Sequence, residues 1–145
     1  MATVKNTIPI ILAAGKGNRM GTVKNKCLLV IDGKTLLEWT IETLRKVDFS
    51  IIVIVTRTTD NQIEKLIKKK NIPDVIIVQD PFFMGAGHAL FLGTLSTNPE
   101  TKYILTLYGD DSFLYTQNTL KKLLSSISNN HSVFQLTTVK KKIIG

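Results

Sequence analysis

The sequence contains little that could stabilise a fold covalently or anchor it in a membrane. One of its 145 residues is a cysteine, Cys27, which excludes an internal disulfide framework and favours a reducing compartment. The longest uninterrupted apolar run after Pro9 is residues 10–14, far short of the roughly 20 residues that span a bilayer. Residues 8–14 are also too short an apolar core for a secretion signal. We therefore expect a cytoplasmic protein without a membrane partner.

Acidic residues are absent from both ends of the chain. Residues 1–31 and 112–145 contain no Asp or Glu, and 19 basic against 11 acidic side chains give a net charge of +8. Such a basic balance is typical of nucleic-acid-binding proteins. However, no aromatic side chains alternate with these cations and no nucleic-acid-binding motif is present. We expect a small phosphorylated ligand and no nucleic-acid partner.

The hydrophobic pattern predicts one domain that covers residues 1–145. Short apolar segments rich in β-branched residues alternate with amphipathic ones, as in parallel sheets that are buried on both faces. The expected strands are residues 8–13, 51–55, 75–78, 103–108 and 133–139. The expected helices are residues 35–46, 60–70, 86–95 and 118–126. This order predicts an α/β fold, a three-layer Rossmann-like sandwich with a mainly parallel sheet.

Three chemically rich loops follow strands of this sheet: residues 13–26, 79–88 and 109–112. Ligands of open α/β sheets bind beyond the carboxyl ends of the strands, where these loops converge. In the first loop, small residues let the backbone approach a phosphate chain closely, and successive N–H groups can bind the anion. Arg19 and Lys26 add cations that suit phosphate oxygens.

A dinucleotide-binding site is an alternative for the glycine loop. Gly15, Gly17 and Gly21 form a related pattern, and Arg57 ends the second expected strand, where a phosphorylated ribose could lie. The dinucleotide fingerprint requires its helix to begin within the glycine loop. Here the next helix is expected only at about residue 35, so this alternative is disfavoured.

The first loop and its continuation resemble the signature of the sugar-1-phosphate nucleotidyltransferases, within the MobA-like NTP-transferase superfamily. Residues 12–20 read LAAGKGNRM and are followed by Asn25-Lys26, where the family has Leu-Ala-Ala-Gly-x-Gly-Thr-Arg-Met and Pro-Lys. Two later segments, MGAGHA at 84–89 and LYGD at 107–110, are similar to LGTGHA and LYGD of the bacterial N-acetylglucosamine-1-phosphate uridylyltransferases. Asn18 and Asn25 depart from the signature.

The resemblance implies transfer of a nucleotidyl group, UMP from UTP, to a sugar 1-phosphate such as N-acetylglucosamine 1-phosphate, with release of pyrophosphate. Since the nucleophile is already an anion, the protein must align and neutralise phosphates, with Mg²⁺ as cofactor. The resemblance assigns catalytic roles to Arg19 and Lys26 and the metal to Asp110. The nucleotide-binding residues that it implies are Leu12, Ala13, Ala14, Gly15, Gly17, Gln79, Gly85 and Ala86.

Several assignments stay open. The family's base-reading glutamine lies five residues before the first glycine of Gly-x-Gly-His, which is Asp80, and Gln79 fits only with a one-residue insertion. His88 is expected to be structural, not a catalytic base. Asp111 is expected to be a solvated neighbour or the cap of the last helix. Cys27 is expected to be a small buried residue, although Lys26 beside it could lower its pKa.

The family's domain continues beyond residue 145, and its acceptor-binding part is absent from this sequence. We expect a sheet edge left open after the last strand, available for self-association or a partner chain. Three explanations for the missing acceptor-binding part stay open. The chain is truncated, it is a half that another chain completes, or it is a divergent protein that kept nucleotide binding without transfer. Two other functions remain open: a non-catalytic nucleotide-binding or regulatory module, and a cytidylyl or guanylyl transferase with another phosphorylated acceptor.

Overall fold

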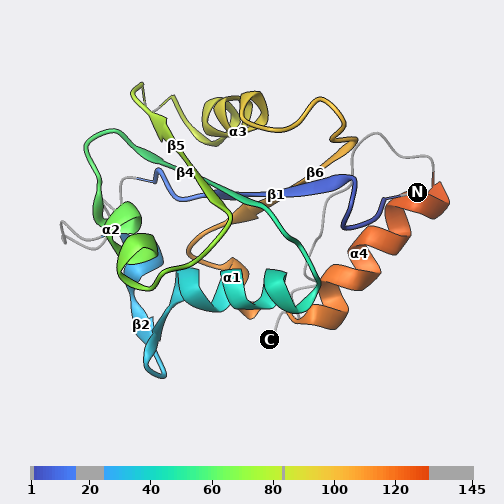
Figure 1. The fold of residues 1–145 in the computed structure, drawn as a ribbon, viewed down its shortest axis with the longest axis horizontal. Coiled ribbons are helices and arrows are strands. Elements are labelled where there is room, and N and C mark those ends of the chain that lie inside the picture. Colours follow the sequence, from blue (N-terminus) through green and yellow to red (C-terminus); the bar gives the residue numbers. More distant parts are fainter. Residues whose placement is uncertain (1, 16–24, 83, 131–145) are drawn as a thin grey trace, which may run out of the picture.

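Four parallel strands form the centre of the molecule. The computed structural model describes residues 2–15, 25–82 and 84–130. The strands are β1 (Thr7–Leu12), β4 (Ile52–Arg57), β5 (Val75–Asp80) and β6 (Tyr103–Tyr108). Their order in the sheet is β5-β4-β1-β6, and every neighbouring pair is parallel (Figure 1).

Helices cover both faces of this sheet. The helices α1 (Leu36–Lys46), α2 (Gln62–Lys69) and α4 (Gln117–Asn130) lie on one side, and α3 (Ala86–Leu95) lies on the other (Figure 1). On the first side Ile11 and Ile54 share a buried cluster with Leu37 of α1, and on the second Leu12 and Val55 share one with Ala89 of α3. Because both faces are buried, the strands are nearly continuously apolar. The three-layer α/β prediction is confirmed.

The predicted elements match the structure except at some boundaries. Helix α2 begins at Gln62 and not at residue 60, because the Asp60 carboxylate accepts a hydrogen bond from the Gln62 N–H (3.0 Å) in the turn before it. Helix α4 continues four residues past its predicted end at residue 126. The predicted strand at 133–139 lies outside the described residues.

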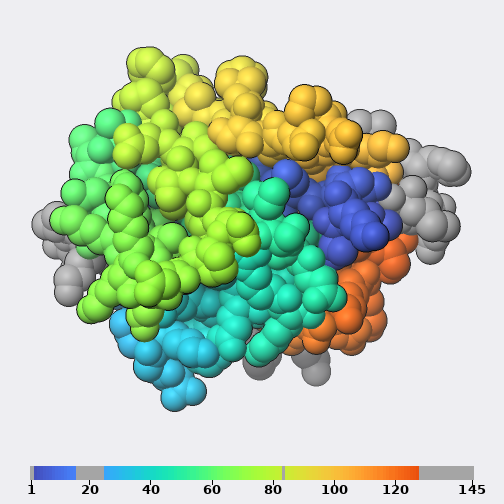
Figure 2. All heavy atoms as spheres, in the orientation of Figure 1, coloured from blue at the N-terminus to red at the C-terminus, as the bar shows by residue number. Residues whose placement is uncertain are grey.

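A small hairpin connects the first loop to α1. It consists of β2 (Val30–Ile31) and β3 (Lys34–Thr35), joined by Asp32 and Gly33, which both have positive φ (51° and 80°). This is the backbone twist that two-residue hairpins favour. In the space-filling view the hairpin, in light blue, lies at the lower margin of the molecule (Figure 2).

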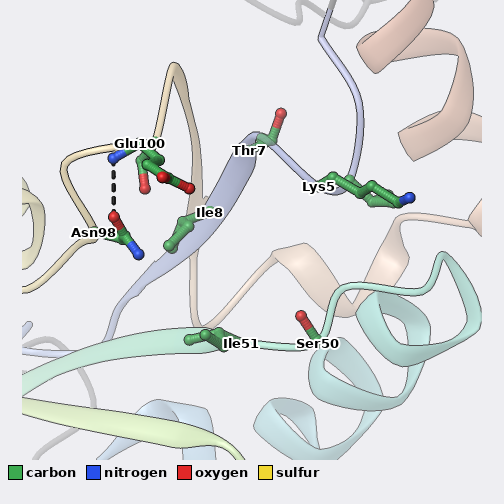
Figure 3. A pocket seen from close by; sticks show the side chains of 9 residues that line it. Lys5, Thr7, Ile8, Ser50, Ile51, Asn98 and Glu100 are labelled. Carbon is green, nitrogen blue, oxygen red and sulfur yellow. Dashed lines mark hydrogen bonds between the residues drawn. The ribbon is translucent and has the colours of Figure 1, made fainter.

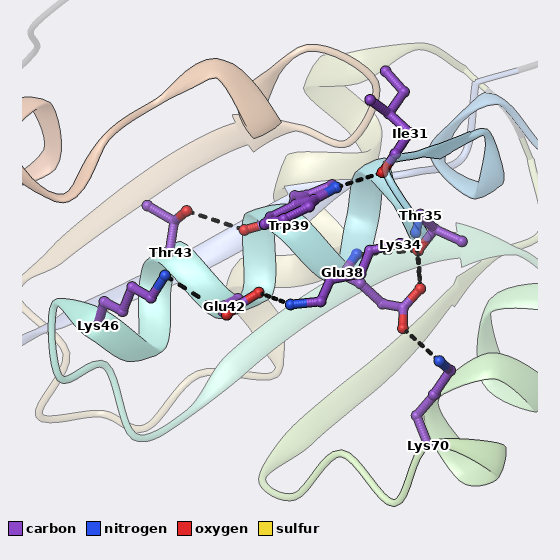
Figure 4. A network of polar contacts seen from close by, with 9 residues as sticks. All are labelled: Ile31, Lys34, Thr35, Glu38, Trp39, Glu42, Thr43, Lys46 and Lys70. Atoms are coloured by element: carbon purple, nitrogen blue, oxygen red, sulfur yellow. Dashed lines mark hydrogen bonds and ion pairs between the residues drawn. The ribbon is translucent and has the colours of Figure 1, made fainter.

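The hairpin is attached to α1 by polar contacts (Figure 4). The Trp39 indole donates a hydrogen bond to the Ile31 carbonyl (2.9 Å), and the Lys34 ammonium pairs with Glu42 at 2.6 Å. Lys34 also lies 4.6 Å from the centre of the Trp39 ring. These contacts hold β2 and β3 against the helix that follows them.

Helix α1 begins with a reciprocal cap. The Thr35 hydroxyl accepts from the Glu38 N–H (3.1 Å), and the Glu38 carboxylate accepts from the Thr35 N–H (2.8 Å). The same carboxylate pairs with Lys70 at the end of α2 (3.1 Å), so it joins two helices (Figure 4). Burial raises the pKa of Glu38, but the Thr35 hydrogen bonds and Lys70 outweigh it, and the pKa lies below its usual value.

No helix within the described ranges combines the length and the apolar character needed to cross a bilayer.

We predict that Glu38→Ala lowers the free energy of unfolding at pH 7 by about 1 kcal/mol, because the cap and the ion pair are lost together. Since the folded-state pKa of Glu38 is lowered, its contribution exists above the unfolded pKa and disappears as the pH falls through the folded value. Urea unfolding of both proteins at pH 7 and in acid measures this difference. Glu42→Ala, which removes only exposed ion pairs, is the control and should cost less. Equal losses for the two variants would contradict the account.

Candidate functional site

Two of the three loops meet directly at the carboxyl edge of the sheet. The Gly109 N–H after β6 donates to the Leu12 carbonyl at the end of β1 (3.0 Å). On the other side of β1, the Ala13 N–H donates to the Val55 carbonyl of β4 (2.8 Å). The end of β5, with Gln79, lies beyond β4. The sequence prediction that the three loops share one edge is therefore confirmed, with β4 between the second loop and the first.

Asn25 fixes the segment that carries Lys26. Its side chain is buried, and the amide donates to the Ala13 carbonyl (2.8 Å) and to the Asp60 carboxylate (2.9 Å). Its side-chain oxygen Oδ1 accepts from the Cys27 N–H (3.1 Å), at the start of a 3-10 turn, η2 (Lys26–Leu28). Asn25 stands where the family signature has proline, and its side chain makes contacts that proline could not.

Cys27, the residue after Lys26, packs against Gly109, the residue before Asp110. A Cβ atom at Gly109 would lie 2.6 Å from the Cys27 sulfur, which is too close for any side chain. Burial, with the negative charge of Asp110 next in importance, raises the pKa of the Cys27 thiol to about 12. The expectation of a small buried residue is confirmed, and the alternative of a lowered pKa beside Lys26 is wrong.

Two adjacent carboxylates, Asp110 and Asp111, follow β6 and are exposed. Neighbouring atoms that shield part of the Asp111 carboxylate from water raise its pKa, and repulsion by Asp110 adds to this increase. Asp111 precedes a separate 3-10 turn, η3 (Ser112–Leu114), so of its two expected roles the cap of α4 is wrong and the solvated neighbour of Asp110 is confirmed. Within the described part of the chain, no three acidic, histidine or cysteine side chains form a metal cluster.

The loop after β5 is anchored by a buried carboxylate. Asp80 is 1% exposed; it accepts from the Phe82 N–H (3.0 Å) and lies 3.2 Å from the His88 Nδ1. The Phe82 ring packs edge-on against His88, with 5.8 Å between ring centres. These contacts give Asp80 and His88 a structural role, while the neighbouring Gln79 is exposed at the sheet edge.

Helix α3 begins beside this loop. Gly85 caps it with a φ of 104°, a conformation that favours glycine, and Ala86 is its first residue. Both are exposed, at the positive end of the helix dipole. This geometry suits a polar or anionic group next to Gly85 and Ala86.

The remaining predicted residues divide into two groups. Leu12 and Ala13 are buried, Ala14 is half-buried and Gly15 is exposed, so the chain emerges from the core along this stretch. Gly17 and Arg19 lie outside the described residues.

The sequence motifs do not identify two side chains that hold the backbone at this edge, Asn25 and Arg57. The Arg57 Nε donates to the Ala14 carbonyl (2.7 Å). The sequence signal for this contact is a basic residue, Arg57, at the end of an apolar strand segment. On its own that signal indicates a ligand phosphate as readily as a backbone carbonyl.

A hollow of about 120 Å³ lies elsewhere, at the amino ends of β1 and β4 (Figure 3). Its lining includes Lys5, Thr7, Ser50 and Glu100, none of which the sequence motifs contain. It is at the opposite edge of the sheet from the three loops.

We predict that Gly109→Ala destabilises the protein by about 1–3 kcal/mol, because the added methyl group collides with the Cys27 sulfur. Cys27→Ala alone should cost less, and the double variant Cys27→Ala/Gly109→Ala should recover most of the stability lost by Gly109→Ala. Thermal unfolding of the four proteins measures the coupling. Additive losses in the double variant would show that the two side chains do not compete for space.

Known proteins resemble this chain in sequence and in structure. The bifunctional protein GlmU of Francisella tularensis subsp. novicida is 38% identical over 108 residues, which cover 74% of this chain and 23% of GlmU. The inositol-1-phosphate CTP transferase from T. maritima superposes with a TM-score of 0.70 at 21% identity, over 86% of this chain and 49% of that one.

Another similar structure contains a bound metal ion. Rv0371C of Mycobacterium tuberculosis H37Rv, in complex with manganese, superposes with a TM-score of 0.61 at 19% identity, over 85% of this chain and 59% of that one. This chain thus spans about a quarter of GlmU, about half of the T. maritima structure and about three fifths of the Rv0371C structure. The sequence model of the MobA-like NTP transferase domain matches residues 9–142, and the chain belongs to that family.

Proposed function

We propose that this chain binds a nucleoside triphosphate with magnesium and transfers its nucleotidyl group, UMP from UTP, to a sugar 1-phosphate such as N-acetylglucosamine 1-phosphate. The observation that carries the proposal is that the three motif loops leave the strands at one edge of the sheet, where Cys27, the residue after Lys26, packs against Gly109, the residue before Asp110. The relationship to GlmU supports the uridylyl and amino-sugar assignment.

A nucleotide at this edge would cross the tips of all four strands. The base would lie near Gln79 and the start of α3, and the phosphates near Lys26 and Asp110, which follow β1 and β6. The strand order β5-β4-β1-β6 supports this direction, because it puts the two ends of the ligand at the two sides of the sheet. The backbone at Ala13–Gly15 would then face the middle of the ligand.

Asp110 would hold the metal, together with phosphate oxygens of the substrate. Magnesium prefers few carboxylate ligands and keeps substrate and water oxygens in its shell, which fits a site with two adjacent carboxylates. When bound, it would neutralise phosphate charge during transfer. The manganese complex of Rv0371C supports a divalent metal in a protein of this fold.

The chemistry requires no covalent intermediate. An acceptor phosphate oxygen attacks the α-phosphorus, the bond to the bridging oxygen breaks, and pyrophosphate leaves with the electron pair. Lys26 and Arg19 would stabilise the charge on the phosphates. The acceptor phosphate is already ionised, so no side chain has to remove a proton.

Gln79 is our candidate for reading the base. Its side chain is exposed, whereas the carboxylate of Asp80 is buried and engaged with the Phe82 N–H and His88. A second candidate function is cytidylyl transfer to another phosphorylated acceptor. It is favoured by the likeness to the T. maritima CTP transferase.

Calorimetric titration of the purified protein with UTP, with and without magnesium, tests the proposal. We predict that Asp110→Asn weakens UTP binding in magnesium by at least about tenfold and leaves metal-free binding unchanged, because one charge-assisted contact is lost. Asp48→Asn, remote from this edge at the end of α1, is the control and should bind as the wild type does. A full magnesium response in Asp110→Asn would remove Asp110 from the site, and no UTP binding by the folded wild type would contradict the proposed function.

A second titration addresses the base. In Gln79→Ala, the preference for UTP over CTP should fall by about tenfold, because one hydrogen bond that distinguishes the two bases is lost. Asp80→Asn should lower the melting temperature and keep the preference. Retained selectivity in Gln79→Ala, with loss in Asp80→Asn, would assign base recognition to Asp80.

A further inference from the structure

Arg57 makes a long-range contact with the backbone of the glycine loop. It is the last residue of β4, and its Nε donates a 2.7 Å hydrogen bond to the carbonyl of Ala14, 43 residues earlier in the chain. Its side chain is half-buried beside the exit of β1. A guanidinium group stays protonated at all physiological pH values, so this hydrogen bond is charge-assisted.

A second side chain holds the preceding carbonyl. The Asn25 amide donates to the Ala13 carbonyl (2.8 Å), and the Ala13 N–H is held by the Val55 carbonyl (2.8 Å). Two consecutive carbonyls are thus each bound by a donor from a different part of the chain. The backbone that leaves β1 is therefore fixed by Asn25, near the other end of the same loop, and by Arg57 of β4.

These contacts also fix the direction of the N–H groups. The carbonyl of Ala14 and the N–H of Gly15 belong to one planar trans peptide, in which they point in opposite directions. When Arg57 holds the carbonyl on its side, the Gly15 N–H is directed away from Arg57. The Asn25 contact constrains the Ala14 N–H in the same way.

Arg57 is also aligned with the anchor of the second loop. In the pairing of β4 with β5, Arg57 stands opposite Asp80, and paired residues on neighbouring strands share a face of the sheet. Asp80 in turn holds the Phe82 N–H and contacts His88 of α3. Arg57 therefore stands between the glycine loop and the loop that precedes α3.

We propose that Arg57 is a positioning residue for nucleotide binding: it holds the peptide between Ala14 and Gly15 so that the N–H of Gly15 is directed at the bound nucleotide. This inference rests on the proposed function, since it assumes a nucleoside triphosphate at the carboxyl edge. It adds a residue that the family motifs in the sequence do not contain.

A second arginine provides a matched control. The Arg45 guanidinium also donates to backbone carbonyls, those of Phe49 (2.8 Å), Ser50 and Pro73, but near the amino ends of β4 and β5. Arg45 and Arg57 thus share a chemical role at opposite edges of the sheet. If Arg57 only supported the fold, loss of either side chain would have the same kind of effect.

The experiment compares Arg57→Gln, Arg57→Lys and Arg45→Gln by thermal unfolding and by calorimetry with magnesium and UTP. We expect Arg57→Gln to weaken UTP binding by roughly tenfold to a hundredfold, the effect of losing one charge-assisted hydrogen bond. Arg57→Lys should recover only part of this loss, because an ammonium lacks the fixed geometry of the guanidinium. Arg45→Gln should lower the melting temperature and leave the affinity unchanged.

Chemical rescue separates positioning from general support of the fold. In Arg57→Ala, added methylguanidinium should restore part of the UTP affinity, and it should do nothing for Arg45→Ala. Wild-type affinity in Arg57→Gln would overturn the inference, and so would full affinity in Arg57→Lys, which would show that charge alone suffices. These outcomes leave the proposed function standing, whereas no UTP binding by the wild type would remove both.

Discussion

The pairing of β1 on both sides is the constraint on which the rest of the structure depends. Because β1 lies between β4 and β6, its carboxyl end is held at once by the Val55 carbonyl and by the Gly109 N–H. A shift of β1 by one residue would exchange the side chains that face α1 and α3 and would separate these contacts. The two buried clusters therefore fix the register, and the register fixes where the glycine loop begins.

One departure from the family signature, Asn25, has a physical explanation in the surrounding contacts, while Asn18 lies outside the described residues. Proline at position 25 would restrict the backbone by itself, whereas Asn25 achieves the restriction with hydrogen bonds to Ala13, Asp60 and Cys27. The small side chain of Cys27 and the missing side chain of Gly109 fit each other, and their contact joins the segment after β1 to the segment after β6. The residues that fit at positions 25 and 27 therefore depend on their contacts with Asp60 and Gly109, far along the chain.

Much of the fold could be predicted because its signals are local. The strands and helices follow from short apolar runs and helical periodicity, and the topology of parallel sheets then places residues 13–15 and Asp110 at one edge. The contacts of Arg57 and Asn25 could not be predicted, because they depend on which strands become neighbours. The cap expected of Asp111 was wrong since η3 intervenes before α4. The functional roles of all the candidate site residues stay predictions, and so does the strand at 133–139; Gly17 and Arg19 also lie outside the described residues.

Backbone amide NMR during titration with UTP and magnesium tests the central claim, that the three loops form one nucleotide site. The account predicts the largest shift changes at the carboxyl edge, in Ala14, Gly15, Cys27, Ala86 and Asp110. It predicts little change around the hollow at the amino edge, in Thr7, Ser50 and Thr101. Changes centred on that hollow, or confined to one of the three loops, would contradict it.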